Sequence, residues 1–157
     1  MASKSACTAE EWNLIKDAPD WVNVALAAAD IKVALITQMK ETKGFKDVVA
    51  SYESGSQLIR DVVADTSKPS KKIKGATLSD AIEALERIAR LLDEKVDLAE
   101  GDRFRTFLVE IGQSVAESAG EGMLGIGEKV SKKEASALQK IEAALKATDA
   151  DKKARAA

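Results

Sequence analysis

Histidine is absent from the 157 residues of this chain, and the only cysteine, Cys7, stands close to the N-terminus. Histidine is the commonest general base and metal ligand, and a cysteine thiolate is both a nucleophile and a soft ligand. Their scarcity removes most of the chemistry by which a small protein becomes an enzyme or a metal site. We therefore expect no enzyme activity, no catalytic residue, no cofactor and no metal site.

Aromatic residues and prolines are also few. Phe, Trp and Tyr make up 4% of the chain and prolines number 2, whereas hydrophobic residues reach 45% and charged residues 32%. A core with so few rings must consist mainly of Leu, Ile, Val and Ala, a mixture that favours helices. No alternating β-branched segment between turn signals predicts a strand. We expect an all-α fold, a single compact bundle of about five to seven helices.

Neither sign of charge dominates the chain, and long hydrophobic runs are missing. The formal net charge is -2, so the sequence gives no strong signal for nucleic acid or an anionic membrane. The longest apolar candidate, Val22 to Ile36, is interrupted by Asp30 and Lys32 and cannot span a bilayer. A lone cysteine and an N-terminus without an apolar signal region lead us to expect a cytoplasmic protein with no transmembrane segment.

The pattern of residues divides the chain into an arm, a bundle and a tail. Residues 1–7 are expected to form a flexible arm, 8–148 the helical bundle domain and 149–157 a frayed polar tail. Within the bundle, residues 65–77 lack apolar periodicity and contain a proline and a glycine, which predicts an exposed loop.

Helix boundaries in the first half follow from capping and breaking residues. Thr8 and Glu11 match a capping box, and Pro19 predicts an interruption followed by a second helix. Asp30 marks another break, and Gly44 is expected to stop the helical pattern that continues between them. The apolar stripes after Gly44 fit either one bent helix or two.

The second half has clearer periodicity. Apolar residues at steps of three and four predict a helix over 78–96, and Asp97 with Glu100 indicates the start of the next one. Ser131 to Glu134 matches another capping box. Gly120 to Gly125 has the letters of the dinucleotide fingerprint, but a helix precedes it where the motif requires a strand, so we interpret 120–127 as a turn.

Charged side chains in this half are interpreted as a solvated face. In the helix after Asp97, Leu108 and Ile111 lie in the middle of the apolar arc, whereas Glu110 and Glu117 lie opposite and face water. The preceding helix contains two acid–base pairs four residues apart, Glu83 with Arg87 and Glu86 with Arg90. The lysines of 65–77 are interpreted as a solvated loop, because no aromatic residue or arginine accompanies them.

Trp12 and Trp21 are the candidate partner surface. They flank Pro19 near a capped helix start, where tryptophan commonly serves as a core or staple residue. A partly exposed pair of tryptophans is instead what a protein-binding surface uses.

Short patches resemble known bacterial proteins. The run from Phe104 through Ala116–Ala119 to Ile141 is similar to the end of a group of small uncharacterised bacterial all-helical proteins. Val24–Asp30 and Gly127–Glu134 resemble segments of TerB-like tellurite-resistance domains, with Ile31 replacing their glycine. The second resemblance implies a stress-response role and acidic cation ligands.

Two functions from different classes follow. The first is a non-catalytic helical interaction or assembly module that binds a protein partner or itself, and it needs an exposed apolar patch. The alternative is a bacterial TerB-like stress-response domain with an acidic cation-binding site, and it needs convergent buried carboxylates.

Overall fold

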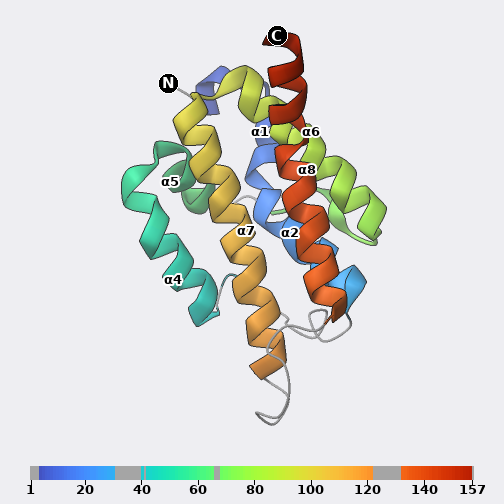
Figure 1. Ribbon diagram of the computed structural model, residues 1–157. Helices are drawn as coiled ribbons and strands as arrows, with labels where there is room; N and C mark the ends of the chain where they lie inside the picture. The colour runs from blue at the N-terminus through green and yellow to red at the C-terminus, as the bar shows by residue number, and fades with distance from the viewer. Residues whose placement is uncertain (1–3, 31–39, 41, 66–67, 122–131, 157) are drawn as a thin grey trace.

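The computed structural model describes residues 4–30, 40, 42–65, 68–121 and 132–156, with the backbone alone for 119–121 and 147–156. Within these residues the chain forms seven α-helices and no strand, which confirms the all-α prediction. The helices, labelled as in Figure 1, are α1 (Ala9–Lys16), α2 (Ala18–Ala29), α4 (Lys43–Tyr52), α5 (Gln57–Ala64), α6 (Leu78–Lys95), α7 (Leu98–Glu121) and α8 (Lys132–Ala156). Short 3-10 turns are η1 (Lys4–Ala6), η3 (Glu53–Gly55) and η4 (Lys71–Ile73).

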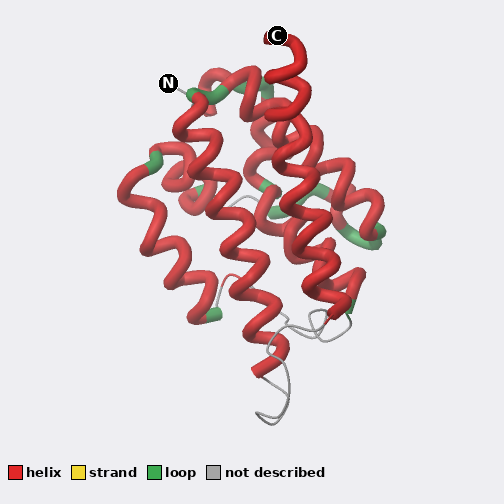
Figure 2. The backbone as a smooth tube through the Cα atoms, viewed as in Figure 1, coloured by secondary structure: helices red, strands yellow, loops and turns green. Residues whose placement is uncertain are grey.

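Helix α2 lies at the centre of the bundle. It packs against α6, α7 and α8, while α4 and α5 pack on the flank of α7 that faces away from α8 (Figures 1 and 2). Ala18 and Ala25 on α2 are fully buried, and their small side chains let the neighbouring helices approach closely. The largest fully buried side chains are mostly aliphatic: Phe104, Phe107, Ile15, Leu26, Leu58, Ile59, Leu85, Ile88, Leu92, Leu108, Ile111 and Ile141.

The predicted start and break of the first two helices are confirmed. The Glu11 N–H donates to the Thr8 hydroxyl (3.1 Å), and the Thr8 N–H donates to the Glu11 carboxylate (2.8 Å), which completes the capping box. Helix α1 ends before Asp17, and Pro19 lies in the first turn of α2, where its missing N–H costs no helical hydrogen bond. Helix α2 ends before Asp30 as expected, and the helical pattern of 31–39 lies outside the described residues.

The prediction that Gly44 stops a helix is wrong. Gly44 is the second residue of α4, whose first turn is capped by the Thr42 hydroxyl accepting from the Phe45 N–H (3.2 Å). A Cβ at position 44 would overlap Oγ of Ser114 on α7. The absence of a side chain therefore serves the close approach of α4 to α7. The prediction that a glycine ends a helix considers only the backbone conformations that glycine adopts. It does not consider the space that glycine leaves for a neighbouring helix.

The stripes after Gly44 form two helices, α4 and α5, with η3 between them. Ser56 caps α5 by accepting from the Ile59 N–H (3.1 Å). Helix α6 begins after Thr77, which forms a capping box with Asp80 that the sequence analysis did not identify. The capping box expected at Ser131 falls partly outside the described residues, and α8 begins at Lys132.

Both ends of the described chain are helical. Part of the expected flexible arm forms η1, and the backbone of α8 stays helical to Ala156 although we expected 149–157 to fray. Those last residues contain neither proline nor glycine and are rich in alanine and lysine, which favour a helix. None of the helices in the described ranges combines the length and apolarity needed to cross a lipid bilayer.

Candidate functional site

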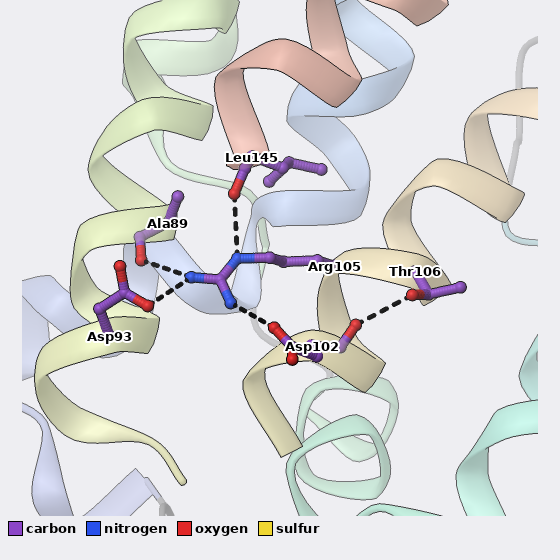
Figure 3. Close-up of polar contacts among 6 residues, drawn as sticks. All are labelled: Ala89, Asp93, Asp102, Arg105, Thr106 and Leu145. Carbon is purple, nitrogen blue, oxygen red and sulfur yellow. Dashed lines mark hydrogen bonds and ion pairs between the residues drawn. The ribbon is translucent and has the colours of Figure 1, made fainter. Parts of the chain in front are cut away.

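A buried arginine joins three helices. Arg105 of α7 is 6% exposed, and its guanidinium donates to the carbonyl oxygens of Leu145 on α8 (2.9 Å) and Ala89 on α6 (3.2 Å). It also forms ion pairs with Asp93 (2.7 Å) and Asp102 (3.0 Å) (Figure 3). Its three guanidinium nitrogens are all hydrogen-bonded, so we assign this Arg105 junction to the fold rather than to a ligand.

The sequence analysis missed Arg105. It follows Phe104 directly, and a step of about 100° along the helix places it at the edge of the apolar arc that the analysis identified. Asp102, three residues earlier, is its nearest acidic neighbour along the same helix. An arginine at the edge of an apolar arc with an acid three positions before it is the signal that could have identified the junction.

Other polar side chains of α7 hold α4 and α5 in place. Glu100 accepts from the Leu58 N–H (2.7 Å) in the first turn of α5, and Arg103 donates to the Tyr52 carbonyl (3.2 Å) at the end of α4. The Tyr52 hydroxyl donates to Glu110 (2.7 Å), which raises the pKa of Tyr52 because the neutral phenol is the donor. Glu110 is exposed as expected, but it is also a partner in the packing of α4.

A second buried charge pair lies where α1 meets α2. Lys16 and Asp17 have side chains that are 5% and 2% exposed, and their Nζ and Oδ1 atoms are 2.9 Å apart. Lys16 also donates to the Lys68 carbonyl (3.0 Å), and the Ser70 N–H donates to Asp17 Oδ2 (3.0 Å). The pair therefore fixes the backbone of the loop that leads to α6.

The described part of the loop expected at 65–77, Asp65 and residues 68–77, is anchored to the helices. Its lysines are exposed to solvent, as the sequence analysis expected. Its backbone, however, is tied to the Lys16–Asp17 pair, and Asp65 accepts from the Trp12 Nε1 (2.7 Å). These contacts join residues more than 50 positions apart, and no local pattern in the sequence encodes them.

Trp12 and Trp21 do not form an exposed surface. They are 4% and 5% exposed and belong to the core, because both side chains are covered at the junction of α1 and α2. Their polar atoms differ in one respect. Trp12 has the hydrogen bond to Asp65, whereas the buried Nε1 of Trp21 has no hydrogen-bond partner in the described part of the chain.

An open cleft lies beside Trp21, between α1, α2, η4 and α6. Its volume is about 620 Å³, within the range of small-molecule sites. The lining residues are Glu10, Asn13, Leu14, Asp17, Trp21, Ser70, Lys71, Lys72, Asp80, Glu83, Ala84 and Arg87. The lining therefore combines apolar side chains with charges of both signs, and Trp21 is the only one of the two predicted tryptophans that belongs to it.

Part of the charge in the cleft is already engaged. Asp17 is paired with Lys16, and Asp80 accepts from the Thr77 N–H (2.9 Å), a bond that lowers the pKa of Asp80. The predicted Glu83–Arg87 ion pair does not form, although Glu86 and Arg90 approach to 3.9 Å one turn further on. Arg87 therefore lines the cleft without a carboxylate partner among the described residues.

Carboxylates do not converge on a cation site in the ranges that the structure describes. No group of three His, Cys, Asp or Glu side chains there could hold a metal ion. Residues 122–131, which include most of the glycine-rich turn and part of the TerB-like resemblance, lie outside those ranges. Gly120 and Glu121 form the last turn of α7.

Comparison with known proteins gives no match: no family model, no curated protein and no solved structure is significantly similar to this chain.

Proposed function

We propose that this chain is a non-catalytic helical module that binds a partner protein through the cleft beside Trp21. The observation that carries the proposal is a buried indole N–H without an acceptor, on a tryptophan that lines a cleft of about 620 Å³. A buried donor without a partner costs about 1–3 kcal/mol, so each such group in a folded protein calls for an explanation, and a ligand in the cleft would supply one for Trp21. The site is thus formed by the cleft and not by an exposed pair of tryptophans.

The chemistry of the lining supports binding rather than catalysis. The chain has no histidine, and its one cysteine, Cys7, does not line the cleft. Clefts that bind ligands combine apolar contacts with a few polar groups that fix orientation, as Leu14, Trp21 and the surrounding charges do here. A lone cysteine needs no oxidising compartment, and we expect a cytoplasmic partner.

The alternative function, a bacterial TerB-like stress-response domain with an acidic cation site, rests on the resemblance of Val24–Asp30 and Gly127–Glu134. None of the described carboxylates supports it by convergence. Titration of the chain with Ca²⁺ or Mg²⁺, followed by calorimetry, tests it: stoichiometric heat would favour this alternative.

The binding module is tested with a variant that fills the cleft. Asn13 is exposed on α1 and lines the cleft, so Asn13→Trp should occupy it without disturbing the core. Glu94→Trp, at an exposed position of α6 outside the cleft, is the matched control. In a pull-down experiment, proteins that are recovered with the wild-type chain and with the control should not be recovered with Asn13→Trp. Equal recovery on all three, or recovery on none, contradicts the proposal.

A further inference from the structure

Helix α4 lies at the edge of the bundle and packs mainly against α7 (Figures 1 and 2). Of its ten residues only Phe45 is buried, whereas α5 buries three of eight residues and α6 buries six of eighteen. A helix of this length is not stable in water by itself, so α4 depends on its contact with α7. Few buried side chains hold it there.

The side of α7 that faces α4 is more polar than the side that faces the core. Arg103 and Glu110 hydrogen-bond to Tyr52 of α4, and the Ser114 hydroxyl lies against the first turn of α4. On the core side, the fully buried residues of α7 include Phe104, Leu108 and Ile111. Burial of apolar surface is the main force that holds helices together, so α4 is held less firmly than the helices of the core.

Tyr52, the last residue of α4, makes most of the described contacts at that end of the helix. Its carbonyl accepts from Arg103 Nη2 (3.2 Å), its hydroxyl donates to Glu110 (2.7 Å), and its ring centroid lies 6.0 Å from that of Phe107. Tyr52 is half-buried and Glu110 is exposed, so water competes for the hydroxyl contact. These contacts form a latch that water can replace.

The turn η3 provides a point about which α4 can move. The carbonyl oxygens of Glu53 and Ser54 accept from Arg60 of α5 (2.7 and 3.1 Å), so η3 is tied to α5. Helix α5 is itself held by its buried side chains and by the Leu58 N–H, which donates to Glu100 of α7 (2.7 Å). The anchored segment therefore begins directly after α4 ends.

We propose that α4 is a reversible lid on α7, latched by Tyr52, which opens at η3 while α5, α6 and α7 stay folded. Segments with few buried apolar contacts open at a lower free energy than the core. Opening uncovers Phe45 and Phe107, which are 6% and 0% exposed when the lid is closed. No residue of α4 lines the cleft beside Trp21, so the lid is independent of the proposed function.

Amide hydrogen exchange of the full chain, followed by NMR, tests the lid. The amides of residues 47–52 should have protection factors that agree within about threefold, because they open together. These values should be at least about a hundredfold lower than those of the buried turns of α6. Equal protection of α4 and α6 would overturn the proposal, because α4 would then open only when the whole chain unfolds.

A disulfide between α4 and α7 distinguishes departure of α4 from unwinding in place. A Cβ placed at Gly44 would lie 3.4 Å from the Ser114 Cβ, close to the separation of about 3.5–4.5 Å in disulfides. In a Cys7→Ser background, Gly44→Cys with Ser114→Cys should show at least about tenfold higher protection of residues 47–52 when oxidised than when reduced. Unchanged protection after oxidation would overturn the lid, because α4 would then unwind without leaving α7.

The variant Tyr52→Phe tests the latch. Loss of the hydroxyl contact should lower the protection of residues 47–52 about fivefold and leave that of α6 unchanged. Arg90→Gln removes an exposed polar contact with Glu86 on α6 (3.9 Å) and is the control, which should leave the protection of α4 unchanged. If Tyr52→Phe lowers the protection of α4 no more than Arg90→Gln does, Tyr52 is not the latch. The wild-type measurement decides separately whether α4 is a lid.

Discussion

The Arg105 junction and the cleft beside Trp21 both bring charged side chains to a meeting point of several helices, but they leave those charges in different states. The Arg105 guanidinium has two carbonyl and two carboxylate partners. In the cleft, Arg87 has no carboxylate partner and Trp21 Nε1 has no acceptor among the described residues. Satisfied buried networks stabilise a unique packing, whereas unsatisfied groups beside open space are available to a ligand.

The largest expected effect separates the two arginines. Arg105→Met should lower the free energy of unfolding by about 3–5 kcal/mol, because it removes one partner of a buried charge pair. Arg87→Met should change it by less than about 0.5 kcal/mol, since Arg87 is exposed and unpaired. Urea unfolding of both variants measures this difference. Equal losses would remove the distinction between a structural and a binding region.

A somewhat smaller effect is expected within α7 itself. Leu108 is fully buried, so Leu108→Ala should cost about 2–5 kcal/mol through lost burial and a cavity. Glu110→Gln should cost less than about 0.5 kcal/mol, because the Tyr52 hydroxyl can donate to the amide oxygen as it does to the carboxylate. Thermal and urea unfolding compare the two. A loss at Glu110 as large as that at Leu108 would make the exposed face of α7 part of a site.

The two tryptophans form a matched pair for the next effect. Trp12→Phe removes a hydrogen bond to a carboxylate at 2.7 Å, whereas Trp21→Phe removes a donor that has no acceptor in the described residues. Trp12→Phe should therefore destabilise the fold by about 1.5–3 kcal/mol more than Trp21→Phe. Urea unfolding of both variants gives the difference directly. If Trp21→Phe costs more, the Trp21 donor has a partner in the fold and loses its significance for binding.

The smallest expected effects concern individual carboxyl groups. Hydrogen bonds from the capping boxes lower the pKa of Glu11 and Asp80, and burial raises the pKa of Asp20. Stability contributed by ionised Glu11 and Asp80 is therefore lost as pH falls through their folded pKa values. Asp20 has the opposite effect on the pH dependence of stability. Because its pKa is raised in the folded protein, its ionisation lowers stability as pH rises above its unfolded pKa. Carbon-detected NMR titration should give Glu11 a pKa below the usual range for glutamate. It should give Asp80 a pKa below, and Asp20 a pKa above, the usual range for aspartate. A pKa of Asp80 above that of Asp20 would contradict the environments described.

Much of the fold could be predicted because its signals are local. The capping box at Thr8, the break at Pro19 and the apolar arc around Leu108 each involve residues within a few turns of one helix. Gly44 shows where local rules end. Its role depends on Ser114, 70 positions away in the sequence, and only the packed structure brings the two together.

The candidate site was harder to predict because it depends on contacts between distant segments. The sequence identified Trp21 and the lysines of 65–77 separately: Trp21 as a core residue or part of a partner surface with Trp12, and the lysines as a solvated loop. The buried Lys16–Asp17 pair brings them to one cleft by holding Lys68 and Ser70. Helical spacing also predicted that Arg87 would pair with Glu83, and the structure leaves both side chains in the cleft without that contact.

The indole N–H signals of the two tryptophans give the most direct test of the cleft as a binding site. The chain contains only Trp12 and Trp21, so a ¹⁵N-labelled sample has two indole cross-peaks, which Trp12→Phe assigns. On addition of a binding partner that is lost on Asn13→Trp, the Trp21 signal should shift in a saturable manner while the Trp12 signal, held by Asp65, stays in place. A saturable shift of Trp12 alone, or binding that moves neither signal, would contradict the assignment of the cleft beside Trp21 as the binding site.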